Sequence, residues 1–411
     1  MYQDLIIYSY KNYKDLQNEY QKRFNAPTTF KTGLHITPSS QKTNVKLTES
    51  NYELFSQTIP EHLELMEEIF LLSKRIEKQS GDLPHAAIEY LEISQLINEI
   101  KSTNDIEGVK STKKEIQEAV DARNTHKNVR FKNTVRSYFT ILDNEKPFID
   151  DLGDFRDIYD KVVKDEIADE YLPDGKYFRK SGVTIYDERN NKVVHRGVSS
   201  EEAIHTALQS LLRFMNRSEI SLFYKAIITH YYFEYVHPFY DGNGRMGRFM
   251  LSSYLAHKLD PFSALSISES IYNNRNKYDK LFIDASNKNN FGDMTLFIFE
   301  MLKIIVKGQK KILNEIELAV LKMEKILNFI TEVDLTNDQK IVLSELLQHY
   351  LFAVYDSTIE NQELDQIIGK QLSRRRIDIA LKELEELNYV KQVKGKPITY
   401  IVLGDNLSYF E

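Results

Sequence analysis

The stretch His237-Pro-Phe-Tyr-Asp-Gly-Asn-Gly-Arg-Met-Gly-Arg248 places an imidazole, a carboxylate, a glycine-rich turn and two guanidiniums next to one another. Gly242 and Gly244 allow the backbone to turn its N–H groups inward, as an anion-binding nest requires. Residues 245–255 have the pattern of a helix, which would place this nest at the positive end of a helix dipole. The stretch therefore predicts a helical core built around a site for phosphoryl or nucleotidyl transfer.

Four side chains of the stretch have the chemistry that such a transfer needs. Arg245 and Arg248 are three residues apart, so both can reach one polyphosphate from the first turn of the helix. Asp241 offers a hard oxygen ligand for Mg²⁺, and His237 can take a proton near neutral pH. Taken singly, a glycine-rich turn or a histidine is most often structural, so the interpretation depends on their combination. His230 lacks an i,i+4 partner for a metal and is predicted to pack in the core.

The same residues match every fixed position of the Fic-domain motif HPFx[D/E]GNGRxxR, and the stretch therefore resembles that family. The resemblance implies that AMP is transferred from ATP, with Mg²⁺, to a hydroxyl of Tyr, Ser or Thr in a target protein or in the chain itself. It implies that His237 deprotonates the hydroxyl, that Asp241 holds Mg²⁺ and that Phe239 anchors the loop. The expected nucleotide-binding residues are Gly242, Asn243, Gly244, Arg245, Gly247 and Arg248 at the phosphates, and Tyr278, Ser286 and Asn287 at the base and ribose.

A second short match lies upstream, at Ser102-Thr-Asn-Asp-Ile-Glu-Gly108, which resembles the inhibitory motif [S/T]xxxE[G/N] of the same family. The matching residues are Thr103, Glu107 and Gly108, in an N-terminal position similar to that of class II members. A carboxylate of Glu107 close to Arg248 would form a charge-assisted pair and occupy the guanidinium that the ATP γ-phosphate needs. ATP would then bind without the in-line geometry for attack. The structural alternative is an exposed glutamate beside a helix-ending glycine.

Residues 176–197 interrupt the helical pattern with two short β-type runs around a polar turn, which predicts a hairpin. In Fic proteins a hairpin of this kind lies over the active site and pairs with the backbone of the target. The resemblance gives that docking role to Val183, Thr184 and Ile185. A surface hairpin without a function remains the alternative.

Composition narrows the class of protein. The chain has 411 residues, of which 42% are hydrophobic and 28% charged, as in ordinary globular proteins, and its net charge of −7 argues against general affinity for nucleic acid. Without cysteine it has neither disulfides nor thiolate chemistry. No signal peptide and no apolar stretch of membrane-spanning length is visible, so we expect a cytoplasmic protein without a membrane partner.

Helical periodicity dominates the chain, which predicts a mainly α fold: a Fic-type helical core with a β-hairpin flap and a separate C-terminal domain. Expected boundaries are 1–84 for an N-terminal helical extension, 85–310 for the core, 311–335 for a linking helix and 336–411 for the last domain. The resemblance also raises the expectation of a homodimer. The choice between ATP and another nucleotide donor, and between AMP transfer and AMP removal, stays open.

The C-terminal residues have the order of a winged helix-turn-helix, with helices expected at 337–351, 361–368 and 374–388 and a hairpin at 389–403. Arg374, Arg375 and Arg376 begin the third helix, and the cations of the hairpin are Lys391, Lys394 and Lys396. Such positions contact DNA phosphates in winged helices. The acidic residues of the third helix, Asp378, Glu383, Glu385 and Glu386, would repel DNA. Docking of a protein is an equally good interpretation.

Overall fold

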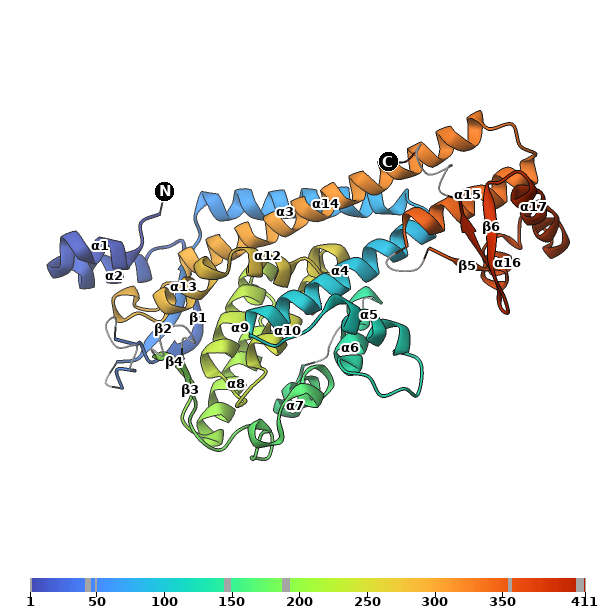
Figure 1. Ribbon diagram of the computed structural model, residues 1–411. Helices are drawn as coiled ribbons and strands as arrows, with labels where there is room; N and C mark the ends of the chain where they lie inside the picture. The colour runs from blue at the N-terminus through green and yellow to red at the C-terminus, as the bar shows by residue number, and fades with distance from the viewer. Residues whose placement is uncertain are drawn as a thin grey trace. The chain divides into compact units, whose positions relative to one another are not determined.

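The computed structural model describes residues 2–40, 46–48, 50–143, 149–186, 193–353, 357–403 and 410. Most of its elements are helices, as expected, and they form two compact units (Figure 1). Unit 1 comprises Met1–Lys74 and Gln95–Ile312, and unit 2 comprises Arg75–Ser94 and Leu313–Glu411. The first 74 residues belong to unit 1, and the domain boundaries expected from the sequence stay a prediction.

Three long helices contain residues of both units, namely α3 (Pro60–Gly81), α4 (His85–Ile106) and α14 (Thr295–Glu332). The other α-helices of unit 1 are α1 (Leu5–Asn12), α2 (Leu16–Phe24), α5 (Lys113–Ala122), α6 (Lys132–Leu142), α7 (Leu152–Val162), α8 (Glu201–Met215), α9 (Leu222–Val236), α10 (Asn243–Lys258), α11 (Pro261–Ala264), α12 (Ile267–Asn273) and α13 (Arg275–Ala285). Within the described ranges, no helix has both the length and the apolar character to span a bilayer.

The centre of unit 1 is the pair of helices α9 and α10, which pack on each other, with α8 against the other side of α9 (Figure 1). Helix α9 has the sequence LFYKAIITHYYFEYV, with apolar residues on almost every face. A helix of that composition is stable only when it is surrounded by protein, and most of its side chains are indeed buried. Helix α10 begins at Asn243, two residues before the expected start at Arg245, and is buried along most of its length.

Two small antiparallel hairpins lie in unit 1. Strands β3 (Thr184–Tyr186) and β4 (Val193–Arg196) form the hairpin that the sequence predicts. Strands β1 (Thr29–Ile36) and β2 (Tyr52–Gln57) form a second one in the region where only helices were expected. That expectation was incomplete: residues 31–36 of β1 alternate between exposed and buried, as in a half-buried strand, although the register shifts near Gly33, which has a φ of +75°.

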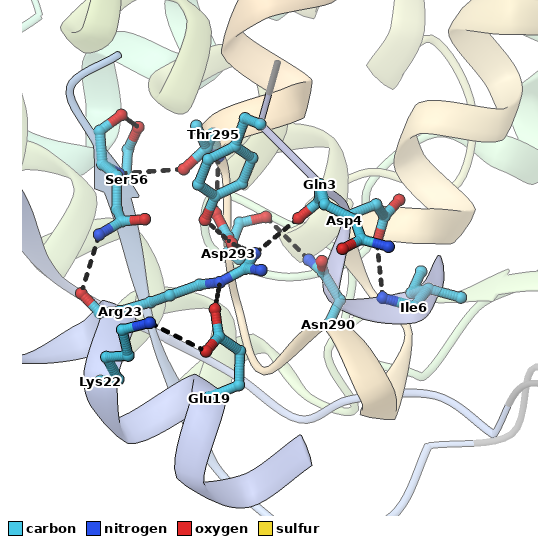
Figure 2. A network of polar contacts seen from close by, with 12 residues as sticks. Gln3, Asp4, Ile6, Glu19, Lys22, Arg23, Ser56, Asn290, Asp293 and Thr295 are labelled. Carbon is cyan, nitrogen blue, oxygen red and sulfur yellow. Dashed lines mark hydrogen bonds and ion pairs between the residues drawn. The ribbon is translucent and has the colours of Figure 1, made fainter. Parts of the chain in front are cut away.

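Arg23, at the end of α2, connects the N-terminal segment to the start of α14 (Figure 2). Its Nε atom donates to Glu19 at 2.8 Å, and one Nη1 distance to Asp293 is 3.7 Å. Asp293 in turn accepts the backbone N–H of Thr295 at 2.9 Å and the hydroxyl of Tyr2 at 2.5 Å. The side chains of Arg23 and Asp293 are 8% and 3% exposed, so this ion pair is almost completely out of water.

Replacing Arg23 by Met is expected to lower the free energy of unfolding by about 3 kcal/mol, because it leaves the buried Asp293 without its cation. Lys22→Met is the matched control, since Lys22 is 79% exposed and pairs with the same Glu19 at 3.6 Å. Urea denaturation followed by circular dichroism measures both changes. Equal effects of the two substitutions would show that burial of the Arg23 pair does not matter.

Unit 2 contains the three helices and the hairpin expected near the C-terminus: α15 (Asn337–Leu351), α16 (Asn361–Ile368), α17 (Arg374–Glu386), β6 (Val390–Gly395) and β7 (Ile398–Val402). A short strand that was not expected, β5 (Ile359–Glu360), pairs with β7, so that the sheet order is β5-β7-β6 and all pairs are antiparallel. The core of the unit is apolar, with Leu343, Leu347, Ile377 and Leu381 fully buried. The sequence therefore predicted the order of the C-terminal elements except for one strand, and the assignment as a winged helix stays a prediction.

Candidate active site

The loop between α9 and α10 is held by its own side chains. His237 ends α9 with a left-handed φ of +53°. Phe239 is fully buried and stacks on Tyr159 with ring centroids 3.9 Å apart, which confirms its expected role as an anchor. The amide of Asn243 accepts from the N–H of Phe239 and donates to its carbonyl, both at 2.9 Å. The side chain of Asn243 is therefore used inside the loop, and only its backbone is available to an anion.

The two glycines of the loop are required for different structural reasons. Gly242 precedes α10 with a φ of +84°, a conformation that other residues rarely adopt. Gly244 lies in the first turn of α10, where a Cβ atom would come within 2.1 Å of Oε1 of Glu107. The start of α10 therefore has backbone N–H groups without helical partners, as an anion site needs, and a carboxylate lies directly against it.

That carboxylate belongs to the upstream motif. Arg248 Nη2 donates to Glu107 Oε1 at 2.7 Å and to the carbonyl of Thr103 at 3.1 Å, and Nε donates to the Thr103 hydroxyl at 2.8 Å. Burial alone would lower the pKa of Arg248, but the charge of Glu107 raises it above its ordinary value. Gly108 follows with a φ of +71°, directly beyond the end of α4. The structure thus brings Thr103 and Glu107 to Arg248, while Gly108 forms the turn that follows them.

Arg245 does not share the environment of Arg248. Its Nη1 atom lies 3.3 Å from Glu166 Oε2, and both side chains are 3% exposed. Burial raises the pKa of Glu166 to about 7, and Arg245 opposes that rise. Arg245 is not among the residues that line the pocket described below. Arg245 thus pairs with Glu166, while its Nε and Nη2 atoms have no hydrogen-bond partner among the described residues, and the expectation that both arginines reach one polyphosphate stays a prediction.

Asp241 lies at the surface of the loop, with 46% of its side chain exposed. One carboxylate oxygen accepts the N–H of Gly242 at 2.5 Å, and the other lies 3.8 Å from Arg245. Over the part of the chain that the structure describes, no group of three or more His, Asp or Glu side chains could hold a metal on its own. A single exposed carboxylate fits Mg²⁺, which is often bound by one or two carboxylates together with the phosphates of a nucleotide.

A pocket of about 650 Å³ opens beside this loop, within the usual range for small-molecule sites. Glu107, His237, Gly244 and Arg248 line it. Other parts of the wall are aromatic or come from the β3–β4 hairpin: Tyr231, Tyr278, Phe282, Ile185, Tyr186 and His195. Glu107, His237, Gly244 and Arg248 therefore face one common cavity, whereas Asp241, Gly242 and Asn243 are not among the residues that line it.

Several of the expected nucleotide contacts line this pocket, and others do not. Tyr278 and Ser286 do, and the hydroxyl of Ser286 lies 2.9 Å from that of Tyr231. Asn287 is absent from the lining, since its side chain accepts the N–H of Asn289 at 2.9 Å and caps a short helix. Gly247 is absent as well, and a Cβ atom at that position would lie 2.1 Å from Oε1 of Glu234.

The hairpin contributes less to the pocket than expected. Of the three residues expected to dock a target, Ile185 lines the cavity, whereas Val183 and Thr184 do not. Thr184 pairs with Arg196, and the carbonyl of Val183 accepts the N–H of Gly197 at 3.1 Å. Tyr186, the residue after Ile185, lines the cavity as well, so the end of β3 and not its start faces the pocket.

Sequence reasoning missed Glu234, a buried carboxylate of the pocket. Burial raises its pKa to about 8, although the charge of Arg248 opposes this. A signal was present, since Glu234 is the only acidic residue of α9 and precedes His237 by one helical turn. His230 is buried as predicted, and its Nε2 lies 2.7 Å from the hydroxyl of Tyr278.

His237 is kept neutral by its surroundings. Burial, followed by the charges of Arg179 and Lys46, lowers its pKa to about 3. A neutral imidazole is the protonation state that can accept a proton. The histidine expected to act as a base is therefore in the form that this role requires.

Comparison with known proteins agrees with the site. Residues 149–255 match the Fic/DOC family, a segment that contains the catalytic loop and the β3–β4 hairpin but not Thr103 and Glu107. The structure is similar to a Fic family protein from Desulfovibrio desulfuricans G20, with a TM-score of 0.53, 18% identity, and coverage of 85% of this chain and 97% of that chain. It also matches a Fic domain containing signaling protein from Bacteroides thetaiotaomicron VPI-5482, with a TM-score of 0.45, 16% identity, and coverage of 61% and 97%. The chain thus carries a Fic/DOC family domain at residues 149–255 and has a Fic-like fold.

Proposed function

We propose that this protein is a self-inhibited adenylyltransferase that transfers AMP from ATP to a hydroxyl side chain of a target protein or of itself. Domains of the Fic/DOC family are generally nucleotidyltransferases that act on proteins. The observation that carries the proposal is the common pocket of His237, Gly244 and Arg248, with Glu107 bonded to the arginine. An imidazole, an anion nest and a cation in one cavity can together accept a proton and stabilise a phosphate.

In the proposed reaction, the hydroxyl of Tyr, Ser or Thr attacks the α-phosphate of ATP. The new bond joins this oxygen to the α-phosphorus, the bond between the α-phosphorus and the bridging oxygen breaks, and pyrophosphate leaves. The neutral imidazole of His237 accepts the hydroxyl proton. The free N–H groups at the start of α10 face the negative charge that develops on the phosphate oxygens.

Asp241 is the residue that would hold Mg²⁺ in this site. Its exposed carboxylate and the lack of a larger ligand group among the described residues fit an ion that is shared with the phosphates. The ion would neutralise charge on the pyrophosphate as it leaves. Tyr278 and Ser286 are the proposed contacts of the base and ribose. Arg245 pairs with Glu166 and lies 3.8 Å from Asp241, and in this proposal it remains a phosphate contact.

Glu107 is the proposed brake. Its carboxylate lies against Gly244 and on Arg248, where phosphate oxygens of ATP would be bound. Two anions cannot share one guanidinium and one nest without strong repulsion. ATP therefore binds in a shifted pose, or with Glu107 displaced, and only the second arrangement allows in-line attack. The same carboxylate is able to orient a water molecule, so that removal of AMP is the alternative reaction of this site.

The β3–β4 hairpin is the proposed docking element for the target. It is a two-stranded sheet, so β3 pairs with β4 alone among the described strands. An extended target segment can add to such an edge through backbone hydrogen bonds, while Ile185 faces the pocket. Backbone pairing of this kind would fix the distance between the hydroxyl of the target and His237.

We further propose that the C-terminal part of unit 2 is a winged helix that docks a protein. Two of its three arginines are already paired: Arg376 makes two bonds to Asp338 at 2.5 and 2.7 Å, and Arg374 lies 3.7 Å from Asp365. Pairing of this kind reduces the charge that is available to DNA phosphates. A DNA mobility shift that weakens with salt and is lost when Arg374, Arg375 and Arg376 are changed to Ala would instead support a DNA-binding regulator.

The proposed reaction is tested by the intact mass of the Glu107→Gly protein after incubation with Mg²⁺ and each nucleotide in turn. We expect the mass to rise by one AMP with ATP, and His237→Ala in the same background to show no gain. A gain in mass with only GTP, UTP or a choline diphosphonucleotide would show that this nucleotide, and not ATP, is the donor. No gain with any nucleotide, in the presence of cell extract as a source of targets, would contradict nucleotidyl transfer.

A further inference from the structure

Arg179 is a fully buried cation that has no role in the mechanism above. It follows α7 in the chain and precedes strand β3 by a few residues. None of the ion pairs found among the described residues includes it. Burial lowers its pKa to about 10, so it is still charged at neutral pH. A buried charge without a carboxylate is costly, which makes its actual partners informative.

The partners of Arg179 are backbone carbonyls around the catalytic histidine. Its Nε atom donates to the carbonyl of His237 at 2.8 Å and Nη2 to that of Val236 at 3.4 Å, while Nη1 donates to Ser181. Its own N–H donates to the carbonyl of Pro238 at 3.1 Å. One residue thus binds three consecutive carbonyls, from Val236 to Pro238, at the negative end of the α9 dipole.

These contacts explain how His237 keeps an unusual backbone conformation. A residue other than glycine with a φ of +53° is strained, and it persists only where its surroundings hold it. The two bonds from the side chain of Arg179 fix the peptide groups on both sides of the His237 Cα atom. Its bond to Ser181 also connects this corner to the segment that leads into β3.

Gly197 shows that the guanidinium needs this space. A Cβ atom at Gly197 would lie 2.5 Å from Nη2 of Arg179 and 3.1 Å from Cβ of His237. The neighbouring Val198 donates its N–H to the carbonyl of Val236 at 3.1 Å. The end of the hairpin, the arginine and the histidine are therefore packed against one another.

We infer that Arg179 is the positioning residue that aligns His237 and the β3–β4 hairpin for proton transfer, an inference that rests on the proposed function. It acts through the backbone of His237 and does not touch the reacting atoms. A residue that serves only stability would lower the amount of folded protein and leave the kcat of the folded fraction unchanged. A positioning residue changes kcat without changing the affinity for ATP.

The charge of Arg179 gives a second readout. The groups that face His237 are Arg179, Lys46 from the N-terminal segment and His195 from β4, whose ring centroid is 6.3 Å away. Glu107 and Glu234 line the same pocket. Because a nearby positive charge disfavours the protonated imidazole, removing Arg179 raises the pKa of His237. Activity is then lost at a higher pH as the solution is acidified.

The test uses Glu107→Gly as the parent and compares Arg179→Lys, Arg179→Gln and the control Lys180→Gln. Lys180 is the next residue, and its side chain is exposed. We expect both Arg179 variants to lose on the order of 10²-fold in kcat through misplacement of the base, with the Kd for ATP unchanged. Arg179→Lys retains the charge and keeps the pH profile of the parent. Arg179→Gln loses activity at a higher pH on the acidic side, and Lys180→Gln behaves as the parent.

Retention of full kcat in Arg179→Lys, or an unshifted acidic limb in Arg179→Gln, would overturn the inference. If Arg179→Lys does not fold, Gly197→Ala is used in its place, because the added methyl group displaces the guanidinium of Arg179. Full kcat in Gly197→Ala would also overturn the inference. If the parent itself transfers no nucleotide, the proposed function fails separately. An NMR titration of His237 in the parent and in Arg179→Gln then decides, and equal pKa values would reject the inference.

Discussion

Glu107→Gly is expected to transfer AMP on the order of 10²-fold faster than the unchanged protein, because the obstacle to in-line binding of ATP is removed. In the structure Nη2 of Arg248 donates hydrogen bonds to Glu107 and to the carbonyl of Thr103. The carboxylate of Glu107 also lies against Gly244. Glycine at position 107 frees both the arginine and the start of α10 for phosphate oxygens. The measurement is the initial rate of label transfer from [α-³²P]ATP at saturating Mg²⁺.

Two further variants show whether the charge or the shape of the Glu107 side chain inhibits the reaction. Glu107→Gln keeps the size of the side chain and one hydrogen bond to Arg248 but loses the charge, so an intermediate rate is expected. Asp105→Asn, at the end of the same helix, removes an acid that pairs with Lys101 and not with Arg248. Its rate should equal that of the unchanged protein. Equal rates for all four proteins would mean that Glu107 does not restrain the reaction.

His237→Ala, in the Glu107→Gly background, is expected to lose a factor of about 10²–10⁴ in kcat, the usual contribution of a general base. The surroundings of the imidazole lower its pKa to about 3, so it is neutral and able to accept a proton near neutral pH. The affinity for ATP should remain, since the Arg248 side chain and the nest of α10 are intact. Single-turnover kinetics together with a binding titration of a fluorescent ATP analogue separate the two effects.

His205→Asn is the matched control for this change, because it removes another imidazole, located on α8 near Glu201 and outside the pocket. It should retain the kcat of the parent. A His237→Ala protein that loses ATP binding in proportion to kcat would indicate damage to the loop and not the loss of a base.

The local features of the catalytic loop could be predicted because a short motif contains the residue types that the loop needs. Gly242 is needed for a left-handed turn, Phe239 for an anchor and Gly244 for a close approach, and all three reasons are visible in a short motif. The pair of Arg248 and Glu107 was predictable for another reason, since a second motif supplied the distant partner.

Features that depend on long-range packing could not be predicted. Nothing in the sequence around Arg245 shows that Glu166 will hold it, or that Arg179 will bind the carbonyls of His237 and its neighbours. The β1–β2 hairpin was missed although residues 31–36 of β1 alternate between exposed and buried, because the connection between its strands is too long to give the signal of a tight turn. Asn287 was assigned to the nucleotide by position alone, whereas its side chain caps a helix. In each case the deciding partner lies far away along the chain or outside the motif.

The absence of a side chain at Gly244 has one more effect on the way this protein can change by mutation. Any larger residue at position 244 would displace the Glu107 carboxylate. Its side chain would also occupy the start of α10, where the phosphates are proposed to bind. A mutation that releases the restraint by this route therefore disables the catalyst in the same step. In the proposed function, substitutions of Gly244 therefore give an inactive protein and not one that transfers AMP without inhibition.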